Sequence, residues 1–450
     1  MKFYRLIKPE VQALIEERRW AELKEALKGI AVPDIADLLL DLGKKDRIIL
    51  FRLLPRPLSS EVFTYLESSH KDALLKEMTD GETRSLLADL SPDDRTEIFE
   101  ELPGQATQRL LNLLDPEDRK ETLKLLGYPE ESVGRLMTPD YVAIRPEWTV
   151  EEALNHIRTR GKDSETINVV YVVDPSWKLL DDLPLRRLIL ARPSDPVEQI
   201  MDHAFVSISA YEDRERAVRL IQHYDLDVLP VVDSEGILVG IVTVDDVMDV
   251  AEEEATEDFQ KVAAVAPLKM NYRESSIWSL YRKRVGWLIA LVLVNLASSG
   301  VIAAYEETLA SAIVLAFFIP LLIDSGGNTG SQSATLIVRA IAMGDVKLRE
   351  WFWAVSREIG VGLLLGLTMG VGAWLLGVFK GGYEIGIVVG LSMASIVVVA
   401  NLVGVVLPFL LSRLRMDPAV ASSPLITSIA DAVGLAIYFS IATWVLRTPG

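Results

Sequence analysis

The sequence Pro320-LLIDSGGNTGSQSA-Thr335 lies inside an apolar stretch that is long enough to cross a membrane. This stretch runs from about Leu309 to Ile341, and a spanning α-helix needs about 20 residues. Gly326, Gly327 and Gly330 stand among oxygen-bearing side chains. Glycines and polar groups at membrane depth predict a locally unwound helix that lines a wet pathway. A polar seam between packed helices is the alternative.

Four further apolar stretches after residue 280 also have the length of membrane-spanning helices. They are Val285–Tyr305, Val355–Phe379, Ile385–Leu414 and Val420–Leu446. Small residues recur every four positions in two of them, at Gly362, Gly366 and Gly370 and at Gly386, Gly390 and Ala394. Such spacing predicts close helix packing in lipid. The sequence therefore predicts five spans.

The basic residues between the stretches predict the orientation of the chain in the membrane. One side has Arg282, Lys283, Arg284, Arg339, Lys347, Arg349, Arg357, Arg413 and Arg415, and the other has Lys380 and Arg447. Basic loops stay in the cytoplasm. We therefore expect a multi-pass protein of the inner (plasma) membrane with a cytoplasmic N-terminus and an outside C-terminus.

The last stretch contains Asp431, and a carboxylate inside a span is costly and marks a candidate functional site. Ser423, Thr427 and Asp431 are spaced by four residues, so they share one face of a helix. A structural pair with a neighbouring donor is the alternative. Mg²⁺ keeps several of its waters and is held by one or two carboxylates. One aspartate per chain, doubled across the two-fold axis of a homodimer, would suit a hydrated Mg²⁺.

The charges divide the chain into two parts. The 450 residues include 46 Lys and Arg and 64 Asp and Glu, but only 12 basic and 10 acidic residues follow from Asn271 onward. The first 270 residues are therefore strongly acidic, which argues against binding nucleic acid. Without cysteine, disulfides and thiolate metal sites are excluded. Oxygen ligands remain, and they suit Mg²⁺, Ca²⁺ or Mn²⁺.

Residues 134–250 contain an internal repeat. Leu136-Met137 aligns with Ile200-Met201, and the segment Tyr171–Asp174 aligns with Pro230–Asp233. Each copy reads as short strands and helices and resembles one half of a tandem CBS pair, a cytoplasmic sensor module. Such pairs often bind adenine nucleotides such as ATP, and Thr243 and Asp246 stand where the ribose would be contacted. A purely structural repeat is the alternative.

Residues 1–130 predict an all-helical cytoplasmic domain. Ser91 and Asp115 each precede a proline, which predicts an N-cap followed by a helix. Acidic residues gather in two places: at Asp93 and Asp94, and along the segment that runs from the second repeat into the connecting helix, at Asp246, Asp249, Glu254, Glu257 and Asp258. A charge run is usually a solvated face. Here it lies between sensor and membrane part, so divalent cations that cancel the repulsion could draw the pieces together.

Three features together identify a family. They are the GGNTGSQSAT run at Gly326–Thr335, the DPAVASSPLITSIADAVG run at Asp417–Gly434, and the domain order. The chain resembles MgtE-type magnesium channels. The resemblance implies a homodimer whose pore is lined by Asp431, Asn328, Ser423, Thr427 and Asp324, with regulatory Mg²⁺ bound by Asp93, Asp94, Asp246, Asp249, Glu254, Glu257 and Asp258.

The expected fold is therefore multi-domain. It comprises an all-α superhelical domain (1–130), an α/β tandem CBS pair (131–250), an acidic connecting helix (251–276) and a five-helix transmembrane bundle (277–450). The expected function is passive import of Mg²⁺, gated by intracellular Mg²⁺, without enzymatic activity. A secondary divalent-cation transporter and a membrane-anchored CBS signalling receptor are the alternatives.

Overall fold

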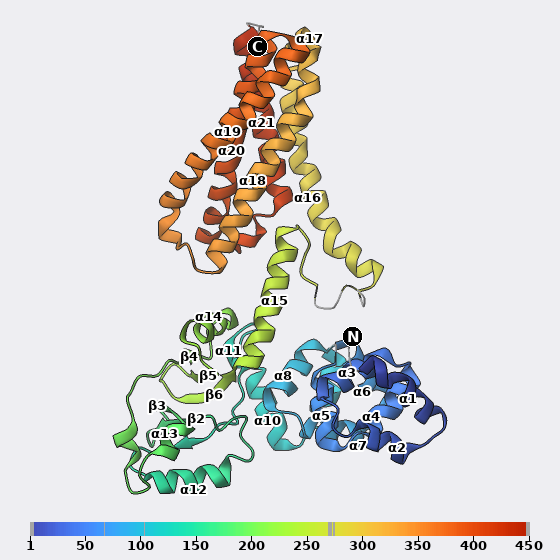
Figure 1. Cartoon of the computed structure of the whole chain (residues 1–450), viewed down its shortest axis with the longest axis vertical. Helices are drawn as coiled ribbons and strands as arrows, with labels where there is room; N and C mark the ends of the chain where they lie inside the picture. The colour runs from blue at the N-terminus through green and yellow to red at the C-terminus, as the bar shows by residue number, and fades with distance from the viewer. Residues whose placement is uncertain (1–3, 67, 103, 269–271, 273–274, 447–450) are drawn as a thin grey trace. The chain divides into compact units, whose positions relative to one another are not determined.

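The computed structural model describes residues 4–66, 68–102, 104–268, 272 and 275–446 (Figure 1). Of the basic residues used above for orientation, Arg447 lies outside these ranges. The chain divides into two compact units, Met1–Glu253 and Glu254–Gly450. The first contains the helical and sensor domains, and the second contains the membrane part.

The N-terminal domain is all-helical, as predicted. Its helices are α1 (Tyr4–Glu16), α2 (Trp20–Leu27), α3 (Val32–Asp41), α4 (Lys44–Leu53), α5 (Arg56–Thr64), α6 (Ser68–Glu77), α7 (Asp80–Ala88), α8 (Pro92–Glu101), α9 (Gly104–Leu111) and α10 (Pro116–Leu125). Leucine and phenylalanine side chains such as Leu38, Leu50 and Phe63 are fully buried between them. The core is therefore a continuous apolar stack.

The two predicted N-caps differ. The Asp115 carboxylate accepts hydrogen bonds from the backbone N–H of Glu117 and Asp118, at 3.1 and 3.0 Å. Ser91 occupies the N-cap position of α8 with Pro92 after it, as predicted, but its hydroxyl donates to Asp94 Oδ2 at 2.7 Å and makes no capping bond to the backbone. The predicted helix start at Ser91 is therefore confirmed, and only the side-chain capping bond is absent. Its hydroxyl is used to satisfy a carboxylate in the first turn.

The sensor domain contains the repeat as two three-stranded sheets of the same topology. The elements are α11 (Val133–Leu136), β1 (Ala143–Ile144), α12 (Val150–Arg160), β2 (Val169–Val173), β3 (Leu179–Pro184), α13 (Leu185–Leu190), the 3₁₀-helix η1 (Val197–Ile200), β4 (Ile208–Ser209), α14 (Arg214–Tyr224), β5 (Val228–Val232) and β6 (Leu238–Thr243). In both sheets the first strand is parallel to the second and the third is antiparallel to it. The sheets therefore confirm the repeat.

The first copy carries aspartates where the second has Gly240-Ile241. The fully buried Asp181 carboxylate accepts hydrogen bonds from the backbone N–H of Asp202 at 2.8 Å and of His203 at 3.1 Å. At Gly240 a Cβ atom would lie 2.9 Å from the carbonyl oxygen of Thr138. The two copies thus use this position differently, one to hold a loop and the other to allow close backbone contact.

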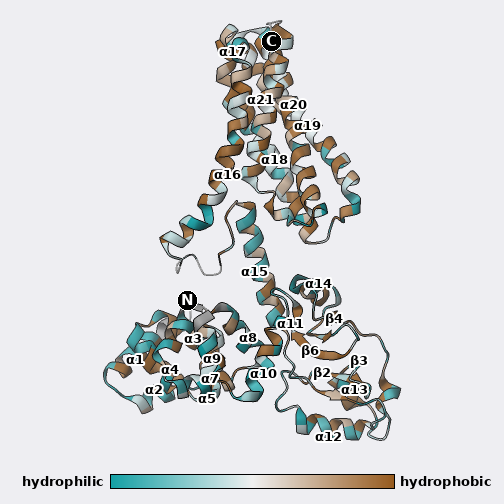
Figure 2. Cartoon of the chain, turned by 180° about the vertical axis from the view of Figure 1, so that it is seen from behind, coloured by the Kyte–Doolittle hydropathy of each residue, from teal (hydrophilic) through white to brown (hydrophobic). Residues whose placement is uncertain are grey.

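The membrane part contains five helices long and apolar enough to cross a bilayer, as predicted. They are α16 (Ile277–Ala304), α18 (Ile319–Ala342), α19 (Trp351–Gly381), α20 (Tyr383–Arg413) and α21 (Ser423–Leu446), with the shorter α17 (Glu306–Ser311) and the 3₁₀-helices η2 (Ile313–Phe318), η3 (Leu348–Glu350) and η4 (Pro418–Val420) between them. Figure 2 shows hydrophobic residues predominating over α16, α19, α20 and α21.

The polar run does not unwind its helix. Helix α18 is continuous through Gly326, Gly327 and Gly330, and the irregular segment is η2, which precedes it. The glycines instead allow close packing. A Cβ atom would lie 2.6 Å from Ile396 at Gly326 and 2.8 Å from Thr427 at Gly327. The predicted break is therefore wrong, because the missing side chains make room for α20 and α21.

The small-residue spacing predicted for α19 and α20 is confirmed as a packing surface. A Cβ atom on Gly370 would lie 3.0 Å from the carbonyl oxygen of Gly390, and one on Gly377 would lie 2.7 Å from the Cα atom of Gly386. These distances leave no space for larger residues. The two backbones therefore touch over several turns, as small residues permit in lipid.

The connecting helix α15 (Val244–Val262) begins directly after β6 and is shorter than expected. Its last turn is held within the second unit. Lys261 Nζ lies 2.6 Å from Asp417 Oδ2, and Val262 packs in an apolar cluster with Val338, Ala421 and Ile426. The end of α15 is therefore attached to the segments that begin α21 and end α18.

The tightest helix contact gives a stability prediction. At Gly404 of α20 a Cβ atom would overlap the carbonyl oxygen of Gly330. Gly404→Ala should therefore lower the free energy of unfolding by about 1–3 kcal/mol, as overpacking typically does. Thermal unfolding of the purified protein in detergent measures this.

Gly372→Ala on α19 is the matched control, because a Cβ atom there meets nothing within 4 Å. Alanine also favours helix over glycine by about 1 kcal/mol. This control should therefore be neutral or stabilising. Equal stability of the two variants would contradict the close α18–α20 contact.

Candidate functional site

A polar stripe follows the exposed side of α18. Asp324 and Asn328 are exposed and one turn apart, and Asn328 Nδ2 donates to Asp324 Oδ2 at 3.3 Å. The buried side of the same helix carries the glycines and Ser333. Because α18 separates small packed residues from polar exposed ones, the stripe is free to line an aqueous path.

The beginning of α21 supplies the second polar surface. Thr427 Oγ1 donates to the carbonyl oxygen of Ser423 at 2.9 Å. Ser331 of α18 lies 3.3 Å from both Thr427 Oγ1 and the carbonyl oxygen of Ser423. Ser331 was not predicted individually, and its place inside the polar run is the signal that could have found it. These hydroxyls join α18 to the polar end of α21.

Asp431 lies one turn further along α21 and is half-buried. Its Oδ1 atom is buried and has no hydrogen-bond partner among the described residues. Asp324 of α18 lies within electrostatic reach and repels it. A carboxylate in this position, with a second one nearby and an unused oxygen, can attract a cation and accept hydrogen bonds from the water around it.

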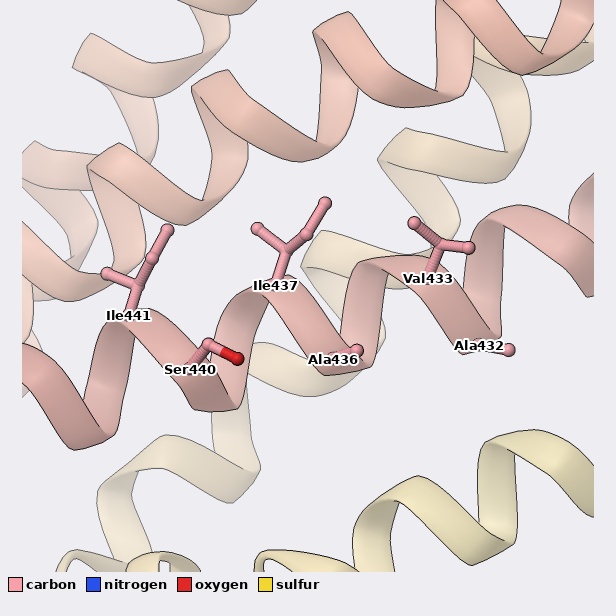
Figure 3. A pocket seen from close by; sticks show the side chains of 6 residues that line it. All are labelled: Ala432, Val433, Ala436, Ile437, Ser440 and Ile441. Carbon is pink, nitrogen blue, oxygen red and sulfur yellow. The ribbon is translucent and has the colours of Figure 1, made fainter. Parts of the chain in front are cut away.

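The residues that follow Asp431 form a shallow hollow on the surface of α21. It has a volume of about 530 Å³ and is lined by Ala432, Val433, Ala436, Ile437, Ser440 and Ile441. Figure 3 shows Val433, Ile437 and Ile441 on one side of the helix and Ala432, Ala436 and Ser440 beside them. These small and apolar side chains lie on the exposed side of α21. At about 3.6 residues per turn, Asp431 lies on the other side of the helix, with the buried Leu435 and Tyr438.

A separate acidic cluster lies within the first unit. Asp93 and Asp94 belong to the first turn of α8, and Asp245 and Asp246 belong to the first turn of α15. Burial, together with the charge of Asp94, raises the pKa of Asp93 above its usual value. Burial and the charge of Asp93 likewise raise the pKa of Asp246. The two helix ends therefore confront each other with like charges.

Asp93 Oδ1 is buried and accepts no hydrogen bond from any described residue. Burial and Coulombic repulsion by Asp245 and Asp94 also raise the pKa of Glu165. Lys71 is buried nearby, forms an ion pair with Glu97 at 3.7 Å, and lowers the pKa of Asp94 against the effect of burial. Glu165 and Lys71 were missed, because they come from distant parts of the sequence. Their positions depend on the folded domains.

The other predicted regulatory residues lie further along α15. Burial and the charge of Glu252 raise the pKa of Asp249. Glu257 forms an ion pair with Lys261, so it is already partnered. Glu254 is the first residue of the second unit, and Asp258 lies four residues further along α15. Within the described ranges, no three histidine or acidic side chains converge closely enough to bind one metal ion.

The two residues predicted to contact a ribose contact each other. Thr243 Oγ1 donates to Asp246 Oδ2 at 2.6 Å. Thr243 ends β6, and Asp246 lies in the first turn of α15. The pair therefore joins the sensor sheet to the connecting helix. The same carboxylate belongs to the acidic cluster.

Comparisons with known proteins cover nearly the whole chain. Residues 319–441 match the MgtE family described as divalent cation transporters, 30–131 match the MgtE intracellular N domain, and 133–194 and 197–253 match the CBS domain. The magnesium transporter MgtE of Thermus thermophilus is 42% identical over 97% of this chain and 98% of that protein. The magnesium transporter MgtE of Bacillus subtilis is 32% identical over 96% and 95%.

Solved structures match the first unit. The cytosolic domain of the Mg²⁺ channel MgtE in complex with ATP covers 54% of this chain and 99% of that one, with 39% identity and a TM-score of 0.52. The soluble part of a magnesium transporter covers 56% and 99%, with 28% identity and the same TM-score of 0.52. With its helical N domain, CBS pair and five membrane helices, the chain belongs to the MgtE family of divalent cation transporters.

Proposed function

We propose that this protein is a Mg²⁺-selective membrane channel that imports magnesium passively into the cytoplasm and closes when intracellular Mg²⁺ is abundant. The proposal rests on Asp431, a carboxylate inside the membrane part. One of its oxygens has no hydrogen-bond partner among the described residues, and the side chain lies beside the polar stripe of α18. The names of the two full-length relatives, both magnesium transporters, support the choice of ion.

The chemistry of the pore suits a hydrated ion. Mg²⁺ loses its waters reluctantly and is usually bound through one or two carboxylates. Asp431 supplies charge, while Asn328, Ser423 and Thr427 supply amide, carbonyl and hydroxyl groups that can bond to the ion's waters. Such a site attracts Mg²⁺ without stripping it, which favours conduction over tight binding.

A homodimer would complete the pore. The α21 surface after Asp431 is open and lined by small and apolar residues, including Ala432 and Ala436. Small residues permit close helix approach in lipid, and two-fold dimers are the commonest closed assembly. A second copy of the chain would contribute a second Asp431 to the pore. Two carboxylates would then share one divalent ion.

The acidic cluster supplies a mechanism for gating. Asp93, Asp246 and their neighbours repel one another when ionised, and a divalent cation would neutralise that repulsion. The buried Oδ1 of Asp93, which accepts no hydrogen bond from the described residues, fits such an ion. Helix α15 begins at the cluster, and its last turn contains Lys261, which is bonded to Asp417 just before α21. A change at the cluster would therefore act on the membrane part through one continuous helix.

Orientation and nucleotide binding complete the proposal. The basic residues that flank the spans favour a cytoplasmic N-terminus, where the acidic cluster can sense intracellular Mg²⁺. Adenine nucleotide binding at Thr243 and Asp246 is supported by the similar cytosolic domain of a Mg²⁺ channel, which was solved in complex with ATP. The mutual hydrogen bond of these side chains would have to open for them to contact a ribose.

A secondary divalent-cation transporter is the competing function, with Asp431 as a coupling site. The sequence has no GxxxxGK[ST] motif for a nucleotide-driven pump. Single-channel recording separates the two, because step-like conductance requires a continuous path.

The first functional test concerns Asp431. Asp431→Ala should reduce Mg²⁺ flux into vesicles at least about tenfold, since a missing intramembrane charge leaves a divalent ion uncompensated. Flux is measured with purified protein in liposomes and a Mg²⁺-sensitive dye.

Asp345→Ala is the matched control, because Asp345 is exposed in the segment between α18 and η3. This control should conduct like the unaltered protein, and both variants should remain folded by thermal unfolding. Undiminished flux through Asp431→Ala would remove Asp431 from the pore.

The second functional test concerns the acidic cluster. The raised pKa values of Asp93 and Asp246 mean that the folded cluster binds protons more tightly than the unfolded chain. Without divalent cations, the stability of the first unit should therefore fall as the pH rises from about 4, the ordinary carboxyl value, toward neutral. Added Mg²⁺ should reduce this fall. Proteolytic protection of the full chain measures both effects.

Asp93→Asn combined with Asp246→Asn should flatten the pH dependence and remove the Mg²⁺ effect on protection and on channel closure. Asp89→Asn combined with Asp163→Asn is the matched control, because both side chains are exposed. If the cluster variant still closes at the same Mg²⁺ concentration as the unaltered protein, the cluster does not sense the ion.

A further inference from the structure

Helix α19 carries a further carboxylate inside the membrane part, at Glu358, besides Asp324 and Asp431. It lies about two turns after the helix begins at Trp351, because one turn takes about 3.6 residues. None of the described lysines and arginines forms an ion pair with it. An intramembrane carboxylate without a cation needs hydrogen-bond donors. The residues that supply these donors indicate its role.

The donors come from two other helices. Asn401 Nδ2 of α20 donates to Glu358 Oε2 at 2.7 Å and to the backbone carbonyl oxygen of Glu358 at 2.8 Å. Ser333 Oγ of α18 lies 3.2 Å from Glu358 Oε2 and is also bonded to Asn401 Oδ1. Ser333 and Asn401 are both buried. Glu358, Ser333 and Asn401 therefore form one polar network across three helices.

The hydrogen-bond network restricts the rotation of α18 more strongly than the packing of its glycines does. The contacts at Gly326 and Gly330 bring α18 close to α20, but apolar packing tolerates small rotations of a helix. A hydrogen bond is directional and weakens steeply away from linearity. Ser333 is therefore the point at which the rotation of α18 is specified. The polar stripe at Asp324 and Asn328 lies on the other side of the same helix.

We propose that Glu358 is a positioning residue for ion conduction. Through Asn401 and Ser333 it holds α18 at the rotation and height that direct the polar stripe toward Asp431. Glu358 acts as a hydrogen-bond acceptor and does not contact the ion. This inference rests on the pore proposed above, but it concerns the helix that supports the pore.

The first experiment tests whether Glu358 acts through its hydrogen-bond acceptor oxygen or through its negative charge. Glu358→Gln keeps an acceptor oxygen at the same reach and removes the charge, so it should keep Mg²⁺ flux within about threefold of the unaltered protein. Glu358→Leu removes the Oε2 acceptor and leaves one N–H of Asn401 without a partner, while the bonds of Asn401 to the backbone carbonyl and to Ser333 remain. Flux should therefore fall about tenfold or more, the factor expected for one orphaned buried group. Flux through Glu358→Gln as low as through Glu358→Leu would overturn the proposal.

The second experiment reports the placement of α18 directly. The chain has no cysteine, so Ser331→Cys with Thr427→Cys introduces the only thiols, at hydroxyls 3.3 Å apart. Oxidative cross-linking of this pair should be as fast with Glu358→Gln as without it. It should be about tenfold slower with Glu358→Leu, the same factor as for flux. Equal rates in all three backgrounds would overturn the proposal.

A milder variant covers the case in which Glu358→Leu does not fold. Ser333→Ala removes one contact of the network and should slow the cross-link and lower flux. Ser356→Ala is its matched control, because the exposed Ser356 hydroxyl donates to the Phe352 carbonyl oxygen of its own helix. Identical behaviour of these two serine variants would also overturn the proposal. If Asp431→Ala conducts normally, the pore itself is wrong, and the cross-linking result remains interpretable.

Discussion

The cost of a carboxylate in a low-dielectric environment governs both halves of this protein. In the membrane part the cost is met in two different ways. Glu358 is surrounded by donors from Asn401 and Ser333, so its hydrogen-bonding capacity is used within the fold. Asp431 keeps an oxygen without a partner among the described residues and has Asp324 as a repulsive neighbour. The first arrangement stabilises a structure, and the second is suited to attract an ion.

Close helix packing makes this distinction possible. Gly330 and Gly404 let the backbones of α18 and α20 meet, and the stripe residues Asp324 and Asn328 lie on the other side of α18. A larger residue at either position would displace the stripe. The glycines therefore contribute to function through geometry. They leave space for neighbouring helices and keep α18 intact, and the irregular backbone lies in the preceding η2.

The sequence predicted the elements well, because spans, repeats and acidic runs are local patterns. Five apolar stretches, the repeated strands and the all-helical first domain appear as expected. The state of α18 was predicted wrongly, because glycine permits both unwinding and close packing, and only the neighbours Ile396 and Thr427 decide between them. The sequence also contained no indication of the contacts of Glu358, because they depend on neighbouring helices. Its partners lie 25 and 43 residues away along the chain.

The cytoplasmic acids follow the same electrostatic rule as the membrane acids. Asp93 and Asp246 are buried close to each other. Because burial and mutual repulsion disfavour their charged forms, both pKa values are raised. Two carboxylates about 4 Å apart repel by about 4 kcal/mol at an effective dielectric constant near 20. Burial of such a pair is favourable only when protons or cations compensate it. The cluster is thus a part of the fold whose stability depends on its ionic surroundings.

Helix α15 connects the ion-dependent acidic cluster to the membrane part. Its first turn belongs to the cluster, and its last turn is bonded to Asp417 and packed against Ile426. Moving a two-state gate from mostly open to mostly closed requires about 5.5 kcal/mol. One site saturated at about 100 times its dissociation constant contributes about 2.7 kcal/mol. Two weak sites are therefore enough. Weak sites also suit a sensor better than tight ones, because they release the ion when its concentration falls.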